Sequence, residues 1–129
     1  MSIAALTLGA ASAAAVDIDD KCLTVAYENA ALNGIGRDRY TVLVGDAVSD
    51  RALKAQLGGG YDIVVANIVA DVIIGLAPSV RQFLKPGGLF LCSGIIDDRA
   101  EEVAQRLREA GWGILRTRQS EGWFSYLCR

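Results

Sequence analysis

The sequence predicts an α/β fold in which a mostly parallel, doubly wound sheet ends in an antiparallel hairpin. Short apolar runs of strand length alternate with segments of helical periodicity along the 129 residues. The run from Ile63 to Ala66 is continuously apolar, as in a parallel strand that is covered on both faces. Two strand-like segments near the carboxyl end are separated only by Ser120-Glu-Gly122, which is typical of a hairpin.

The first elements of the chain alternate between helix and strand. Residues 2–8 predict a helix that ends at Gly9, and residues 13–18 predict a short strand that is rich in alanine. Apolar residues then recur at helical spacing until Asn33-Gly34, which closes the helix. Asp19 or Asp20 is placed to cap that helix at its amino end.

The middle of the chain repeats the strand-helix pattern. Residues 40–44 predict a strand and residues 51–57 a short helix. The strand that ends at Asn67 leads into helical residues 69–84, which Pro78 should divide, so that the second part begins at the proline. Asp71, near the start of that helix, is expected to be a cap rather than a ligand.

The last third predicts a strand, a helix and the hairpin. Lys85-Pro-Gly-Gly88 is a strong stop, and residues 89–93 follow it as a strand. The helix from residue 97 has one apolar face, with Glu102 and Arg106 paired opposite, and it ends at Gly111. Residues 112–119 and 123–128 form the hairpin, and residues 1–129 are expected to form a single domain.

Composition excludes several classes of function. The net charge is −2 and the 13 basic and 15 acidic residues form no long run of either sign, so the chain shows no footprint for nucleic acid or an anionic membrane. No segment reaches the length of a membrane span, and the alanine-rich amino end lacks the positive leader of a signal peptide. The absence of histidine excludes Ser-His-Asp and Cys-His catalysis and histidine metal ligation, and no metal site is expected.

The cysteines indicate the compartment. Cys22, Cys92 and Cys128 are far apart, lack metal-site spacing and stand among apolar residues, as reduced, buried cysteines of a cytosolic protein do. A thiol nucleophile is the less favoured alternative. A cytoplasmic protein is therefore expected.

Three polar side chains fall at or just beyond the carboxyl ends of predicted strands: Asp17, Asp46 and Asn67. They would share the rim of the sheet where open α/β folds bind ligands. An acid after the second strand of a nucleotide-binding fold typically accepts hydrogen bonds from both ribose hydroxyls. Asp46 is placed to meet an adenine edge, and Asn67 offers both a donor and an acceptor. The alternative is that each of these residues only caps or turns the chain.

A nucleotide-binding unit of this kind begins with a strand and a glycine-rich turn before its first helix. Here the chain starts within what should be that first helix, and no such turn precedes it. A binding rim is thus predicted with one of its usual parts missing.

A series of short motifs resembles the catalytic domain of the PrmA family, the methyltransferases of ribosomal protein L-eleven, over essentially the whole chain. The most specific are the Asn-Ile-Val-Ala of residues 67–70, the Leu-Ala-Pro of 76–78 and the Lys-Pro-Gly-Gly of 85–88. The others, in chain order, lie at residues 2–10, 16–19, 28–34 and 93–95.

The resemblance implies a Rossmann-like fold of the S-adenosylmethionine-dependent methyltransferases. It places Asp17 on the ribose of S-adenosylmethionine, Asp46 at its adenine, and Asn67 near its methionine end and the incoming amine, as the catalytic residue. The family methylates lysine side-chain amines and an amino-terminal amine of a protein of the large ribosomal subunit. Such chemistry does not need histidine, because it depends mainly on positioning a neutral amine in line with the methyl carbon.

Two parts of the family pattern are absent from these residues. One is the first strand with its Gly-x-Gly-x-Gly turn, which cradles the methionine part of the cofactor. The other is the amino-terminal domain that recognises the ribosomal protein. Because the absent strand is central in the family's sheet, between those ending at Asp17 and Asn67, two apolar edges are expected to stay unpaired and to favour self-association. The chain is therefore expected to be a fragment with impaired activity.

Two other functions compete with this interpretation. One is a non-catalytic interaction module on a decayed methyltransferase scaffold. The other is half of a nucleotide-binding oxidoreductase, which the pairing of Asn-Ile-Val-Ala with Lys-Pro-Gly-Gly disfavours.

Overall fold

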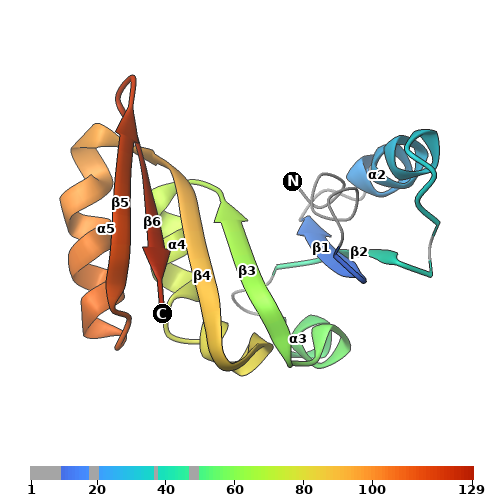
Figure 1. The fold of residues 1–129 in the computed structure, drawn as a ribbon, viewed down its shortest axis with the longest axis horizontal. Coiled ribbons are helices and arrows are strands. Elements are labelled where there is room, and N and C mark those ends of the chain that lie inside the picture. Colours follow the sequence, from blue (N-terminus) through green and yellow to red (C-terminus); the bar gives the residue numbers. More distant parts are fainter. Residues whose placement is uncertain (1–9, 18–20, 37, 47–49) are drawn as a thin grey trace. The chain divides into compact units, whose positions relative to one another are not determined.

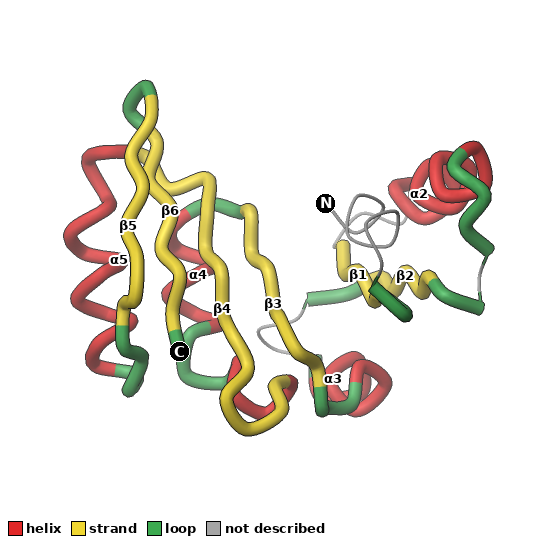
Figure 2. Tube along the Cα trace, viewed as in Figure 1, coloured by secondary structure: helices red, strands yellow, loops and turns green. Residues whose placement is uncertain are grey.

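The structure is a computed structural model that describes residues 10–17, 21–36, 38–46 and 50–129. Its contacts divide the chain into two compact units, residues 1–57 and residues 58–129. Figure 1 labels the helices and strands of both units, and Figure 2 colours them by type. The helix predicted at residues 2–8 and the cap predicted at Asp19 or Asp20 lie outside the described residues.

The first unit contains two parallel strands joined by a helix. Strand β1 (Ala13–Asp17) pairs with β2 (Tyr40–Val44), and α2 (Lys21–Leu32) is the crossover that a parallel pair requires. The Tyr27 hydroxyl accepts a hydrogen bond from the backbone N–H of Val42 at 2.9 Å, which ties α2 to β2. A small core lies between them, made of Ala30, Ile35, Tyr40 and Val42.

Helix α3 (Arg51–Leu57) follows this pair of strands. The carboxylate of Asp50 accepts a hydrogen bond from the backbone N–H of Leu53 at 3.0 Å, as a helix cap does. The predicted bounds of β2 and α3 are confirmed.

The second unit is a four-stranded sheet with the strand order β3-β4-β6-β5. Its strands are β3 (Tyr61–Asn67), β4 (Leu84–Ile96), β5 (Ile114–Ser120) and β6 (Trp123–Cys128). Strands β3 and β4 are parallel, and β6 is antiparallel to both β4 and β5. The predicted fold class, with its antiparallel terminal hairpin, is confirmed.

Helices α4 (Ala70–Leu76) and α5 (Asp97–Glu109) pack side by side on one face of this sheet (Figure 1). The core lies between these helices and the strands, and its fully buried side chains include Ile73, Phe90, Val103, Leu107 and Cys128. The apolar face predicted for α5 is this buried face, because residues three and four apart share one side of a helix. The predicted end of α5 near Gly111 is also confirmed.

Several local expectations are corrected. Within the described residues of the second unit, strand β3 is covered on one face only, since Ile63 and Val65 are exposed. Asp71 does not cap α4, whose cap residue is Val69 and makes no side-chain cap bond. After Pro78 the chain forms a single 3₁₀ turn, η1 (Val80–Phe83), rather than a further α-helix.

The turn at Lys85-Pro-Gly-Gly88 does not precede β4 but lies inside it as a bulge. Tyr61 of β3 pairs with Leu84, and the pairing then resumes at Ile63 with Leu89. The intervening residues of β4 therefore loop out of the ladder.

Candidate functional site

Asn67 is the last residue of β3 and stands at the carboxyl edge of the parallel β3–β4 pair, where it is exposed. Its backbone partner on β4 is Ser93. The side chain follows a strand whose alternate residues Val64 and Ala66 face the helices, so a period of two directs Asn67 to the open face with Val65. The polar group is thus available to a ligand at this edge.

Gly94 forms one wall of the Asn67 site. A Cβ built on Gly94 would stand 2.7 Å from the Asn67 Oδ1, and the backbone of Gly94 has a φ of +77°. The positive φ favours glycine at this position, and a Cβ there would displace the Asn67 amide. In the sequence, Gly94 stands out only as part of the motif at residues 93–95, and its nearness to Asn67 is visible only in the fold.

The helix after Asn67 is held by charged groups. Arg99 of α5 donates a hydrogen bond to the Asp71 carboxylate at 2.6 Å and a second to Glu102 at 3.0 Å. The hydrogen bond and positive charge of Arg99 lower the pKa of Asp71, and the two carboxylates raise the pKa of Arg99. Glu102 therefore pairs with Arg99, rather than with Arg106 as the sequence suggested. These contacts fix the start of α4 against α5 beside the strand end.

Asp17 and Asp46 lie in the first unit, at one edge of the β1–β2 pair. Asp17 is the last residue of β1 and pairs with Val44, and Asp46 follows β2 two residues later. The side chain of Asp46 is exposed, and its backbone carbonyl accepts a hydrogen bond from the N–H of Asp50 at 2.8 Å. The structure thus brings these two residues to one carboxyl edge, while Asn67 occupies the carboxyl edge of β3 in the other unit.

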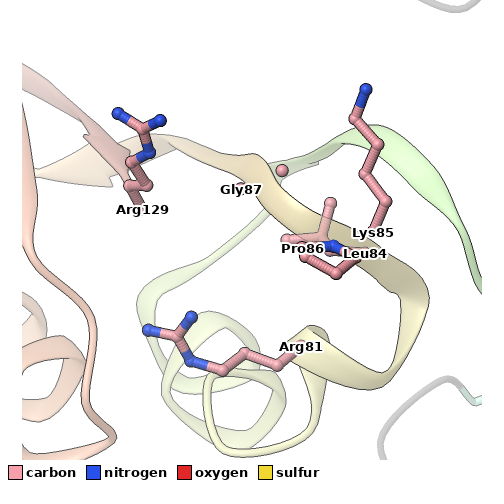
Figure 3. A pocket seen from close by; sticks show the side chains of 7 residues that line it. Arg81, Leu84, Lys85, Pro86, Gly87 and Arg129 are labelled. Carbon is pink, nitrogen blue, oxygen red and sulfur yellow. The ribbon is translucent and has the colours of Figure 1, made fainter.

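A pocket of ≈ 270 Å³ lies at the other end of the second unit's sheet, around the bulge in β4 (Figure 3). Arg81 and Arg129 line it together with residues 84–88. The guanidinium of Arg81 stacks over the Trp112 ring at 4.0 Å and donates to the Gly111 carbonyl at 2.7 Å. Leu84 pairs with Tyr61 at the start of β3, and Ser93 pairs with Asn67 at its end. The pocket and Asn67 therefore lie at opposite ends of the parallel strands.

The described thiols are not placed for chemistry. Cys92 and Cys128 are both fully buried in the core between the sheet and the helices. The hydrogen bond with Cys128 and burial both raise the pKa of Cys92, so that thiol stays protonated near neutral pH. Within the described ranges, no group of three acidic or cysteine side chains comes together to hold a metal ion. Nor is any described helix long and apolar enough to cross a membrane.

Comparison with known proteins finds similarity to a single family along the entire chain. A family model described as "Ribosomal protein L11 methyltransferase (PrmA)" matches residues 1–129. The ribosomal protein L11 methyltransferase of Desulforamulus reducens is 43% identical over 128 residues, which cover 99% of this chain and 39% of that protein. The corresponding protein of Agathobacter rectalis is 39% identical over 124 residues, covering 95% of this chain and 38% of its own length. The chain thus spans less than half the length of these curated relatives.

Solved structures support the fold. The ribosomal protein L11 methylase of Lactobacillus delbrueckii subsp. bulgaricus has a TM-score of 0.88 at 32% identity, covering 99% of this chain and 62% of that one. Fibrillarin of Aeropyrum pernix, solved with natively bound S-adenosyl-L-methionine, has a TM-score of 0.73 at 14% identity, covering 92% and 55%. The second likeness shows the fold alone, which is the Rossmann-like fold of the S-adenosylmethionine-dependent methyltransferases. The model of the ribosomal protein L11 methyltransferase (PrmA) family matches residues 1–129, and the chain belongs to that family.

Proposed function

We propose that this chain is part of an enzyme that transfers the methyl group of S-adenosylmethionine to amines of a protein of the large ribosomal subunit. The observation that carries the proposal is the family match over residues 1–129. The position of Asn67 supports it, since a polar side chain at the carboxyl edge of a parallel strand pair lies where open α/β sheets bind ligands. The described surface of the site provides an amide and no strong base.

The proposed roles are those that the resemblance to the family implies for these residues. Asp17 accepts hydrogen bonds from the ribose hydroxyls, and Asp46 contacts the adenine. Asn67 contacts the methionine end of the cofactor, and it is also the catalytic residue that orients the incoming amine. A carboxylate suits the diol because it accepts two hydrogen bonds, and an amide suits the methionine end because it both donates and accepts.

The reaction itself is an in-line displacement. S-adenosylmethionine, when bound, supplies a methyl group on a sulfonium that leaves as a neutral thioether. The lone pair of a neutral amine attacks the methyl carbon, so the work of the protein is to hold the two groups in line. The carbonyl oxygen of Asn67 is suited to this task because it can accept a hydrogen bond from the amine and direct its lone pair.

We further propose that residues 1–129 form one partial catalytic domain of a cytoplasmic protein, with impaired activity when isolated. The sequence contains no Gly-x-Gly-x-Gly turn, the element that cradles the methionine part of the cofactor in the family. A single cooperative unfolding transition, seen together by fluorescence of the tryptophans and by circular dichroism, is expected of one domain. Two separate unfolding transitions would show that residues 1–129 form two domains instead of one.

Calorimetric titration of the 129-residue chain with S-adenosylmethionine tests the proposal. We expect weaker binding than that of an intact methyltransferase, and a further loss of about tenfold in Asn67→Ala from one lost hydrogen bond to a charged ligand. Gln119→Ala is the matched control, because it removes an exposed amide from the far edge strand. Equal affinity for S-adenosylmethionine in the two variants would show that Asn67 does not contact the cofactor. Affinity equal to that of an intact methyltransferase would refute the proposal that the isolated chain is impaired.

A second candidate function is a non-catalytic interaction module that self-associates through strand edges. The observation that favours it is the exposed apolar surface of β3, an edge strand of the second unit. Self-association without any binding of S-adenosylmethionine would favour this function over methyl transfer.

A further inference from the structure

The pocket beside the bulge of β4 is lined by basic side chains and by no acidic one. Its lining residues are Arg81, Arg129 and residues 84–88, all within the second unit (Figure 3). Among the described residues, neither arginine forms an ion pair with a carboxylate. The third basic side chain, Lys85, is ion-paired with Asp62 of β3, which offsets its charge. Two guanidinium groups thus line this pocket without a described counter-charge.

The turn between α5 and β5 holds both arginines in place. The Gly111 carbonyl accepts a hydrogen bond from the Arg81 Nη2 at 2.7 Å, and the Arg81 Cζ lies 4.0 Å from the centroid of the Trp112 ring. Trp112 is itself fixed, because it is buried in the core of the second unit. Gly113 exchanges two backbone hydrogen bonds with Arg129, of 2.9 and 3.2 Å. The guanidinium of Arg81 and the backbone of Arg129 are therefore positioned before any ligand binds.

Both arginines keep hydrogen-bond donors for a ligand. The described hydrogen bond of Arg81 uses only its Nη2 group, and stacking on a ring leaves the other N–H groups of the planar fork available at its edge. The side chain of Arg129 is exposed. Guanidinium forks match the oxygen atoms of phosphate, and two of them suit a doubly charged group better than a singly charged carboxylate.

The bulge of β4 leaves room for such a group. Gly87 has a φ of +79°, and no atom lies within 4 Å of the position that its Cβ would take. The pocket volume of ≈ 270 Å³ is several times the volume of about 30 Å³ that a water molecule occupies in the liquid, so a phosphate group fits.

We propose that this pocket binds a phosphate group, either as free phosphate or as the terminal phosphoryl group of a larger molecule. Arg81 and Arg129 hold its oxygen atoms from η1 and from the residue after β6. The site is separate from the one proposed for methyl transfer, because Leu84 and Asn67 pair at opposite ends of the β3–β4 ladder.

NMR titration of the full 129-residue chain with inorganic phosphate at constant ionic strength tests the proposal. Backbone amide signals of residues 87–88 and 111–113 should shift along one saturating curve. Arg129→Gln should raise the dissociation constant of phosphate about tenfold, the effect of one lost hydrogen bond to a charged group. It should leave the chain folded, because the described hydrogen bonds of Arg129 are those of its backbone. Arg118→Gln, the matched control, removes the same charge from an exposed arginine outside the pocket and should leave the constant unchanged.

Two further titrations test the chemical class of the ligand. Arg81→Lys keeps the charge but removes the fork, so it should also weaken the binding of phosphate. Acetate should shift the same signals less readily than phosphate does, because it carries a single charge. Equal effects of Arg129→Gln and Arg118→Gln would overturn the proposal, as would shifts that do not saturate or acetate binding as tight as that of phosphate.

Comparison with O-phosphoserine distinguishes the two sources of the phosphate group. Tighter binding of O-phosphoserine than of inorganic phosphate would support the phosphoryl group of a larger molecule as the ligand. Tighter binding of inorganic phosphate would support free phosphate. Absence of a saturable shift with either compound would overturn the proposal.

Discussion

Arg99 on α5 holds Asp71 on α4 through a hydrogen bond of 2.6 Å between its Nη2 atom and the Oδ1 atom of the carboxylate. The same guanidinium contacts Glu102, one turn further along α5, through two hydrogen bonds of 3.0 Å. One arginine therefore joins the two helices that cover the sheet, at the end of α4 that follows Asn67.

This contact predicts an acidic titration of Asp71. The hydrogen bond and charge of Arg99 lower its pKa below 3.8, so the contact stabilises the fold above pH 3.8 and is lost as the pH falls through the lower, folded-state pKa. Carboxyl NMR titration should show Asp71 titrating below 3.8, and Arg99→Gln should return it towards that value. Glu101→Gln, on the same helix and outside the described ion pairs, is the control. Titration of Asp71 at or above 3.8 in the intact chain would contradict the prediction.

Gly94→Ala should damage the Asn67 site specifically. Alanine at a φ of +77° is strained, and its Cβ would also stand 2.7 Å from the Asn67 Oδ1. Gly122→Ala is the matched control, because Gly122 has a φ of +84° with no atom within 4 Å. Urea unfolding should show a loss of about 1 to 2 kcal/mol for the control, from backbone strain alone, and a larger loss for Gly94→Ala. Equal losses would mean that Asn67 moves aside without cost.

Trp112→Phe should destabilise the chain far more than Trp123→Phe. The Trp112 side chain is 2% exposed, and its Nε1–H donates to the Ala77 carbonyl at 2.9 Å, so phenylalanine would leave that oxygen unsatisfied. The expected loss in free energy of unfolding is about 1 to 3 kcal/mol. Trp123 is 53% exposed, and its substitution should change the free energy by less than about 0.5 kcal/mol. Similar losses by urea unfolding would contradict the role of the Ala77 hydrogen bond.

Cys92 and Cys128 should resist thiol reagents in the folded chain. Both are fully buried, and the raised pKa of Cys92 removes its reactive thiolate near neutral pH. Mass spectrometry after brief treatment with iodoacetamide should find neither residue labelled, and both labelled once urea has unfolded the chain. Rapid labelling of Cys92 in the native chain would contradict this prediction and support a function as a thiol nucleophile.

Sequence predicts best the elements whose signals are local. The bounds of β2 and α3 follow from a short β-branched run and from a capping aspartate at Asp50, both of which lie within a few residues of the element. The hairpin follows in the same way from Glu121-Gly122, both of which adopt the positive φ that its tight turn requires. Local chemistry decides these elements, so no knowledge of distant contacts is needed.

The remaining features depend on contacts that the sequence does not show. The bulge at Lys85-Pro-Gly-Gly88 arises from the register between β3 and β4, and the pairing of Glu102 with Arg99 depends on the placement of α4. The candidate site also has one part that the sequence predicts and one part that only the fold shows. A polar residue after an apolar strand pointed to Asn67, but the close approach of Gly94 follows only from the pairing of Asn67 with Ser93.

The position of β6 between β4 and β5 sets the order in which the second unit can be assembled during synthesis. Residues 114–120 leave the ribosome before residues 123–128, yet β5 has its described sheet contact only with β6. Co-translational folding can therefore build β3, α4 and β4 first, but β5 must wait for β6 to enter beside β4. Until Cys128 has emerged, one side of β4 and the part of the apolar face of α5 that packs on β5 and β6 remain without their final partners, and a chaperone that binds nascent chains would find them exposed.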